Sequence, residues 1–447
     1  MDRYYRARRI SVKKFAVTIF VISIVLVAAA FGRRQPAEPV EPLVANAWFI
    51  SDVEYMLYVL ENNFALFHVA YWGHSADIPA IVDNVIQTLA ASEAITVYEF
   101  DELLAEAFLP LLSVGHFRVN VRSPDDEYME MAYLLLSDKA AAEETLLRIS
   151  RILGVETASL LAAIIINGDI AELAYNLKLL TYLEYVVENS HMQMKVLEYG
   201  RVAYMSVSSF MHFTEEDIIQ IRDFYLEIGQ FEHLILDFRG NGGGCLRPFI
   251  NYILIPLWNE PIAIESYILT LTGEYSRQFL TSPLREHRLG LLERFFLLDT
   301  ELRPISTIIE ESYLPLLNIS DRPYYGFRAV VRINRSRIQR FENVNFNGCI
   351  WILIDDGVGS AAHVSSWIAK ESGFATLVGD TTFGAWGGQR VTVTLPYSGT
   401  HFYMDLFNVL DSRGYAIEAG IEPHIFNRPG LCALKTALAL IDEMHTP

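Results

Sequence analysis

The sequence predicts an α/β core preceded by a helical region, and three observations carry this prediction. The first is a strand at 202–209, a capped helix at 214–228 and a strand at 234–238 that ends in a glycine turn. The second is a buried strand at 350–354 that leads into a helix at 361–371. A strand–helix–strand order is typical of parallel pairing. The third is the helical spacing of apolar residues in the first quarter of the chain.

The chain begins with a basic head and an apolar run. Residues 1–34 hold eight Lys or Arg and one Asp, a net of +7; since the whole chain carries −19, the remainder carries −26. Phe15–Gly32 has no charged residue and is barely long enough to cross a bilayer, which would leave the basic side cytoplasmic and the remainder outside. Ala28–Ala30 also fits a signal-peptidase site, so a cleaved signal remains open, although the long basic lead favours an anchor. Residues 35–46, with three prolines, are expected to be an extended linker.

The composition of the chain argues against several classes of function. At 447 residues, 52% hydrophobic and 20% charged, the chain has room for more than one folded domain. Its acidic total disfavours nucleic acid as a partner. No cluster of His, Cys or Glu has metal-ligand spacing, so we expect neither a metal nor a cofactor. Three sparse cysteines are expected to be buried and apolar rather than a disulfide framework, with one bridge left open: Cys245, Cys349 and Cys432.

Residues 47–122 are predicted to form an N-terminal helical domain, with helices at 48–67, about 80–92 and 96–112. The domain ends in a turn followed by a strand in which apolar and polar residues alternate. His116 lies between the turn and the strand. A lone histidine at a strand start is more often structural than catalytic.

Residues 123–197 are rich in helix formers and are expected to be a helical insertion. The stretch 148–168 loosely resembles a helix-turn-helix, but the acidic total and the external location argue against DNA binding. Residues 198–447 then form the α/β core.

Ser360 lies on the tight turn between the strand at 350–354 and the helix that follows it. This position presents the hydroxyl at the end of the strand, where unpaired amides at a helix start can stabilise negative charge. The simpler interpretation is a helix N-cap, the commonest role of serine at such a place.

The glycine turn at 239–244 suggests close approach of the backbone to a ligand. Cys245 stands where a dinucleotide-binding pattern needs glycine, and no Gly-Lys-Ser or Gly-Lys-Thr follows, so a phosphate loop does not fit. Free N–H groups on this turn fit an oxyanion hole better.

Four motifs in this order resemble peptidase family S41, the tail-specific and tricorn-type serine proteases. They are Leu112–Val119, Asp237–Gly244, Gly359–His363 and Val378–Gly384. The resemblance covers roughly 48–121 and 198–427. It implies a ββα spiral core like that of ClpP and crotonase, with an N-terminal helical cap and a helical insertion.

The resemblance also implies site roles. Ser360 matches the nucleophile, His116 the histidine base of the tricorn-like branch, and Glu418 its acidic residue; the oxyanion donors match the amides of Gly242, Gly243 and Ala361. Chemically, a serine hydroxyl needs a neighbouring base, and a carboxylate would orient the histidine and stabilise its charged form.

Five departures distinguish this chain from the tail-specific branch and from the usual motifs. Ala385 replaces the lysine base of that branch, and no PDZ-like segment follows His116, which together select the histidine branch. The other departures are Gly115 for a serine, His363 for a common glutamate and His424 for an aspartate. His363 shares a helix face with Ser360 and is a competing base, although a surface or capping role is favoured.

We therefore expect an extracytoplasmic, membrane-anchored serine peptidase that acts on peptides or unfolded protein through an acyl-enzyme and a Ser-His-Glu arrangement. Two alternatives remain open. One is a non-catalytic S41-like protein that binds a peptide or an apolar ligand, and the other is a serine esterase that uses the same hydroxyl.

Overall fold

The computed structural model describes most of the chain after residue 45. The described residues are 46–121, 135, 139–152, 158, 161, 162, 165, 177, 192–211, 213–281, 296–298, 303–307, 324–333, 344, 346–385 and 390–444. Within these ranges no helix is long and apolar enough to cross a membrane, and the span expected at 15–32 lies outside them. The chain divides into two compact units, and the larger one comprises 46–93, 104–119 and the chain from 190 onward. Every residue of the candidate site belongs to this larger unit.

The N-terminal helical region is confirmed. Its helices are α2 (Asn46–Asn63), α3 (Phe67–His74), α4 (Ile78–Ala91) and α5 (Val97–Ala107), followed by the short turn η1 (Leu109–Leu111). The helix expected at 48–67 ends at Asn63, and a second helix, α3, begins at Phe67 after a turn. Asp77 is the N-cap of α4, and its carboxylate accepts the Ala80 N–H at 3.1 Å, as is typical of aspartate at this position. In the smaller unit, α7 covers Lys139–Ile152, and most of the expected insertion at 123–197 lies outside the described residues.

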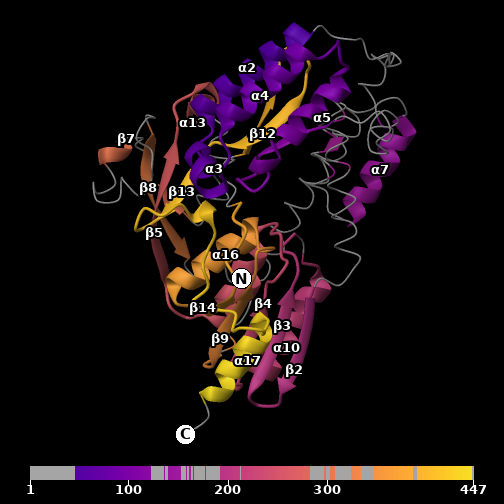
Figure 1. Ribbon diagram of the computed structural model, residues 1–447. Coiled ribbons are helices and arrows are strands. Elements are labelled where there is room, and N and C mark those ends of the chain that lie inside the picture. The colour runs from indigo at the N-terminus through magenta and orange to yellow at the C-terminus, as the bar shows by residue number, and fades with distance from the viewer. Residues whose placement is uncertain are drawn as a thin grey trace. The chain divides into compact units, whose positions relative to one another are not determined.

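A six-stranded sheet forms the centre of the larger unit (Figure 1). Its strands, from edge to edge, are β14 (Ile425–Phe426), β10 (Thr376–Gly379), β9 (Cys349–Ile354), β4 (His233–Asp237), β3 (Val202–Val207) and β2 (Met192–Glu198). All neighbours pair in parallel except β2 and β3. The helix α10 (Glu215–Ile228) connects β3 to β4, and α16 (Ser360–Ser372) connects β9 to β10. The predicted α/β class is confirmed.

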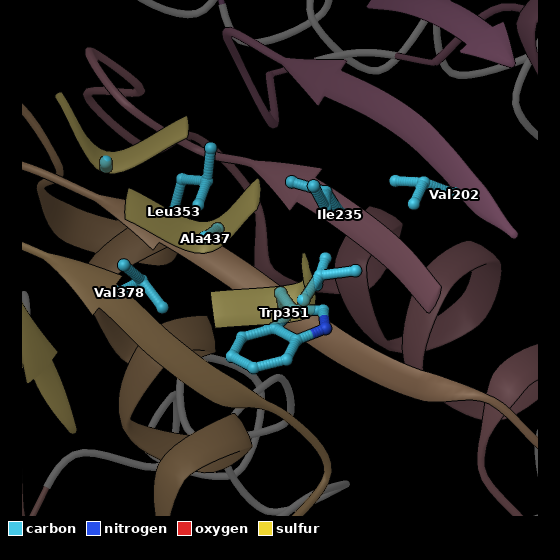
Figure 2. Packing of buried hydrophobic residues seen from close by; sticks show 8 residues of the cluster. Val202, Ile235, Trp351, Leu353, Val378 and Ala437 are labelled. Carbon is cyan, nitrogen blue, oxygen red and sulfur yellow. The ribbon is translucent and has the colours of Figure 1, made fainter. Parts of the chain in front are cut away.

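The core of this sheet explains why its central strands are continuously apolar. Trp351 and Leu353 of β9 lie in a cluster with residues of the neighbouring strands and of α17 (Ala433–Glu443) (Figure 2). Side chains alternate along a strand, so Ile350, Ile352 and Ile354 face the opposite side and are also buried. A parallel strand buried on both faces needs large apolar residues throughout. The parallel register also sends the loops after β4, β9 and β10 out at the same edge of the sheet.

The described residues also form two smaller sheets. One pairs β13 (Asn408–Asp411), β5 (Ile262–Thr270), β8 (Tyr325–Ile333) and β6 (Phe296–Leu298), with β7 (Arg303–Pro304) also on β8. The other has the order β1 (Arg118–Asn120), β12 (His401–Asp405) and β11 (Arg390–Thr394). β12 ends at Asp405, and after two residues the chain continues as β13 in the other sheet. The end of β12 lies beside the start of β1, where His116 is found.

Candidate active site

Ser360 is the first residue of α16 and is held in a strained backbone conformation. Its φ is +48°, in the left-handed region that residues with a Cβ rarely occupy. Its N–H donates to the Gly384 carbonyl at 2.9 Å, and the preceding Gly359 N–H donates to the Asn241 carbonyl at 3.0 Å. Gly359, not Ser360, is the N-cap, and no side chain caps the helix. The capping interpretation is therefore wrong, and such strain at a half-buried serine is typical of a functional site.

The glycine turn after β4 packs directly against this serine. A Cβ at Gly243 would lie 2.6 Å from Ser360 Cβ and 2.7 Å from the Ala361 nitrogen, and its φ of +104° also requires glycine. The Gly243 N–H donates to Asn241 Oδ1 at 2.8 Å, which corrects its expected role as an oxyanion donor. Among the described residues, the amides of Gly242 and Ala361 have no hydrogen-bond acceptor. These two amides are the ones that remain available to an anion.

His116 is held by Asp405, a residue that the sequence analysis did not single out. Its Nδ1 lies 3.1 Å from Oδ2 and 3.3 Å from Oδ1 of Asp405, and its backbone N–H donates to Oδ2 at 2.8 Å. Burial alone would lower the pKa of His116, but the hydrogen bond and charge of Asp405, with a contribution from Glu418, outweigh burial and Arg390 and raise it. A proton on Nδ1 that faces Asp405 leaves Nε2 as the basic nitrogen.

Glu418 contacts the backbone of two turns of the site. It lies in the short turn η5 (Ile417–Ala419) and is buried, and its Oε1 accepts the N–H groups of Gly115 and Ala385, each at 2.7 Å. Those residues adjoin His116 and Gly384, and the Gly384 carbonyl holds the Ser360 N–H. Glu418 thus connects the turn that carries His116 to the turn that carries Ser360. Asp405 occupies the position beside the imidazole that was expected for Glu418. No hydrogen bond joins Ser360 Oγ to His116 among the described residues, as is common in unliganded enzymes.

The position of Asp405 explains why residue 115 is a glycine. Its φ is +60°, and a Cβ there would collide with Asp405 Oδ2. The serine that the tricorn-like pattern has at this position would not fit. A carboxylate from β12 fills the space instead.

His363 is fully buried, so its expected surface or capping role is wrong. Its Nδ1 lies 2.8 Å from Thr382 Oγ1, which also accepts the Ile421 N–H. Burial lowers the pKa of His363 to about 3 and outweighs the opposing effect of the Ile417 backbone. A buried histidine that stays neutral beside Thr382 fits a structural role rather than that of the base.

Further observations concern His424, the three cysteines and groups of possible metal ligands. His424 is structural, since its Nδ1 accepts the Leu377 N–H at 2.9 Å. All three cysteines are free, and Cys349 and Cys432 are exposed rather than buried. Across the described part of the chain, no group of three His, Cys, Asp or Glu could hold a metal ion. The signal that could have identified Asp405 is a lone carboxylate that ends a largely hydrophobic segment and is followed by Leu406 and Phe407.

Comparisons with known proteins agree with this architecture. The model of Peptidase family S41 matches residues 201–426. The structure of mature CPAF complexed with lactacystin has 13% sequence identity and a TM-score of 0.51, covering 90% of this chain and 98% of that one. A crystal structure from Parabacteroides merdae ATCC 43184, assigned there provisionally as a peptidase, has 13% identity and a TM-score of 0.50, covering 89% of this chain and 96% of that one. At this identity both show a shared fold alone. No curated protein matches the sequence.

Proposed function

Because the chain belongs to peptidase family S41, a family of serine peptidases, we propose that it cleaves peptide bonds through an acyl-enzyme formed on Ser360. One observation carries the assignment of residues. Through Glu418, the strained turn of Ser360 is tied to the turn of His116, whose ring is held by the buried Asp405. The proposed arrangement is therefore Ser-His-Asp, with Glu418 as the residue that positions both turns.

The chemistry follows from these positions. His116 Nε2 takes the proton of the Ser360 hydroxyl as the oxygen attacks the carbonyl carbon, and Asp405 stabilises the imidazolium that forms. The amides of Gly242 and Ala361 donate to the oxyanion of the tetrahedral intermediate. The imidazolium then protonates the leaving amine. Water attacks the acyl-enzyme with His116 again as base, which releases the acid and restores the serine.

We also propose that the catalytic part lies outside the cytoplasm on an N-terminal anchor. The basic head and the uncharged run Phe15–Gly32 support this. Protease treatment of intact cells should remove the catalytic part and leave a cytoplasmic control protein whole. Protection in intact cells combined with digestion in lysed cells would refute the location.

An active-site fluorophosphonate tests the proposed function most directly. We expect it to label Ser360, and we expect Ser360→Ala to abolish both labelling and peptide hydrolysis while the circular dichroism spectrum stays unchanged. A folded protein that is not labelled would favour the non-catalytic binding protein. Labelling together with hydrolysis of short esters but no peptide would favour the esterase.

A further inference from the structure

A cavity of about 640 Å³ lies beside α16, the helix that begins at Ser360, and the proposed mechanism does not use it. Its walls come from α3, the C-terminal half of α16, Thr381 and the loop 411–422. Neither Ser360 nor His116 lines it. The volume is within the range of ordinary ligand pockets, about 300–1,000 Å³.

The cavity combines aromatic walls with a small excess of negative charge. Trp72 and Tyr415 line it and are 62% and 53% exposed. The Arg413 guanidinium lies 5.4 Å from the centre of the Tyr415 ring and pairs with Asp411 at 2.7 Å, so its charge is largely compensated. The Lys370 ammonium donates to the Glu422 carbonyl at 2.8 Å.

Counting the lining groups gives the sign of the charge. The carboxylates are Glu371, Asp411 and Glu422, and the cations are Lys370 and Arg413, which leaves one negative charge. His68 adds none near neutral pH, since burial lowers its pKa to about 4. An aromatic or aliphatic group without negative charge fits these walls, and an acidic group does not.

The helix α16 sets the distance from this cavity to the serine. Trp367 and Glu371 of the cavity wall are seven and eleven residues beyond Ser360 on the same helix. At 1.5 Å per residue, they lie about 10–16 Å along the axis from the serine. An extended peptide covers this distance in about three to five residues, at roughly 3.3 Å each.

We propose that this cavity binds a remote segment of the peptide substrate, about four residues from the scissile bond, through an aromatic or large aliphatic side chain. The inference rests on the proposed peptidase function and adds its substrate preference. The walls select an uncharged or cationic segment and reject an acidic one.

Peptide length and a cavity-filling variant test this inference. The substrates are a short fluorogenic peptide and the same peptide extended by four residues on either side, ending in Phe or in Asp. We expect one Phe extension to raise kcat/KM about tenfold or more over the short peptide, and the matching Asp extension to give no gain. Equal values for all of these peptides would overturn the proposal.

Gly73→Trp is the cavity-filling variant. Gly73 lines the cavity from α3, and a Cβ there meets only Val69 Cγ1, at 3.6 Å, so the first carbon of the new side chain is accommodated. The ratio of kcat/KM for the Phe extension over the short peptide should fall at least fivefold. Leu226→Trp places the same side chain on the exposed face of α10, away from the cavity, and should keep the ratio. An unchanged ratio in Gly73→Trp would refute the site, as would an equal loss for both substrates.

A binding measurement separates this inference from the proposed function. Calorimetric titration of the Phe-extended and Asp-extended peptides onto the Ser360→Ala protein needs no turnover. Preferential binding of the Phe peptide that Gly73→Trp weakens supports the cavity even if the wild-type protein proves inactive. Active enzyme with no such preference would refute the cavity and leave the peptidase intact.

Discussion

Replacing the buried carboxylates Asp405 and Glu418 one at a time tests which of them orients His116 and stabilises its charged form. Asp405→Asn removes the charge that lies 3.1 Å from His116 Nδ1, whereas Glu418→Gln keeps an oxygen for the Gly115 and Ala385 amides. A hydrogen bond to a charged group contributes about 1.5–3 kcal/mol, so lost stabilisation of the imidazolium alone should lower kcat/KM roughly 10- to 150-fold. The Asn amide can also donate to Nδ1, which places the proton on Nε2, the wrong nitrogen. The combined loss should reach about 1,000- to 10,000-fold.

The pH profile adds a second signature. In the wild-type enzyme kcat/KM should rise with pH as His116 loses its proton, with a midpoint above the ~6.5 of an ordinary histidine because its pKa is raised. Asp405→Asn should move that midpoint to lower pH, while Glu418→Gln should lose only about tenfold in kcat/KM.

Initial rates on a quenched peptide from pH 5 to 9, with thermal melts to confirm folding, measure both effects. The reasoning is refuted if Glu418→Gln loses more activity than Asp405→Asn, or if Asp405→Asn leaves the midpoint where it was.

Further predictions follow from the same contacts. Gly243→Ala should remove activity, because its Cβ would press on Ser360, whereas Gly229→Ala, with no contact closer than 3.5 Å, should keep activity and melting temperature. Gly115→Ala should be inactive in the same assay, because its Cβ collides with Asp405. His363→Ala should lower the melting temperature yet cost far less activity than His116→Ala, and the opposite order in kcat/KM would contradict the assignment of the base. Since the folded-state pKa of His116 is raised, its contribution to stability is complete below about pH 6.5 and is lost as the pH rises through the folded value; the melting-temperature deficit of His116→Gln should therefore shrink from pH 5 to pH 9.

The fold was predictable from the sequence because its signals are local. The apolar runs of β4 and β9, and the helices that follow β3 and β9, are set by neighbouring residues, and so is the glycine turn before α11 (Leu246–Pro248). The position of Ser360 followed from such a strand-to-helix turn. His116 was found through its motif, since nothing in its own neighbourhood separates a base from a structural histidine.

Contacts between segments far apart in the sequence could not be predicted from local patterns. Three residues illustrate this: Asp405, Glu418 and Gly243. Which carboxylate reaches His116 depends on the place where β12 ends against the turn before β1, and this pairing joins segments far apart in the sequence. Whether the Gly243 amide is free depends on the rotamer of Asn241, which also donates to the Val207 carbonyl at 2.9 Å. The buried state of His363 depends on two loops far apart in the sequence, one with Thr382 and the other with Ile421.

The order of the site residues along the chain has a consequence for biosynthesis. His116, the glycine turn and Ser360 are all translated before Asp405 and Glu418. Until the last two emerge from the ribosome, the base has no carboxylate to orient it, and the two turns have no common acceptor. We therefore expect a nascent chain that stops at β11 to be catalytically silent although it already carries the residues proposed as nucleophile and base. Ribosome-stalled chains ending before residue 400 should resist fluorophosphonate labelling, and labelling of such chains at the full-length rate would contradict this dependence.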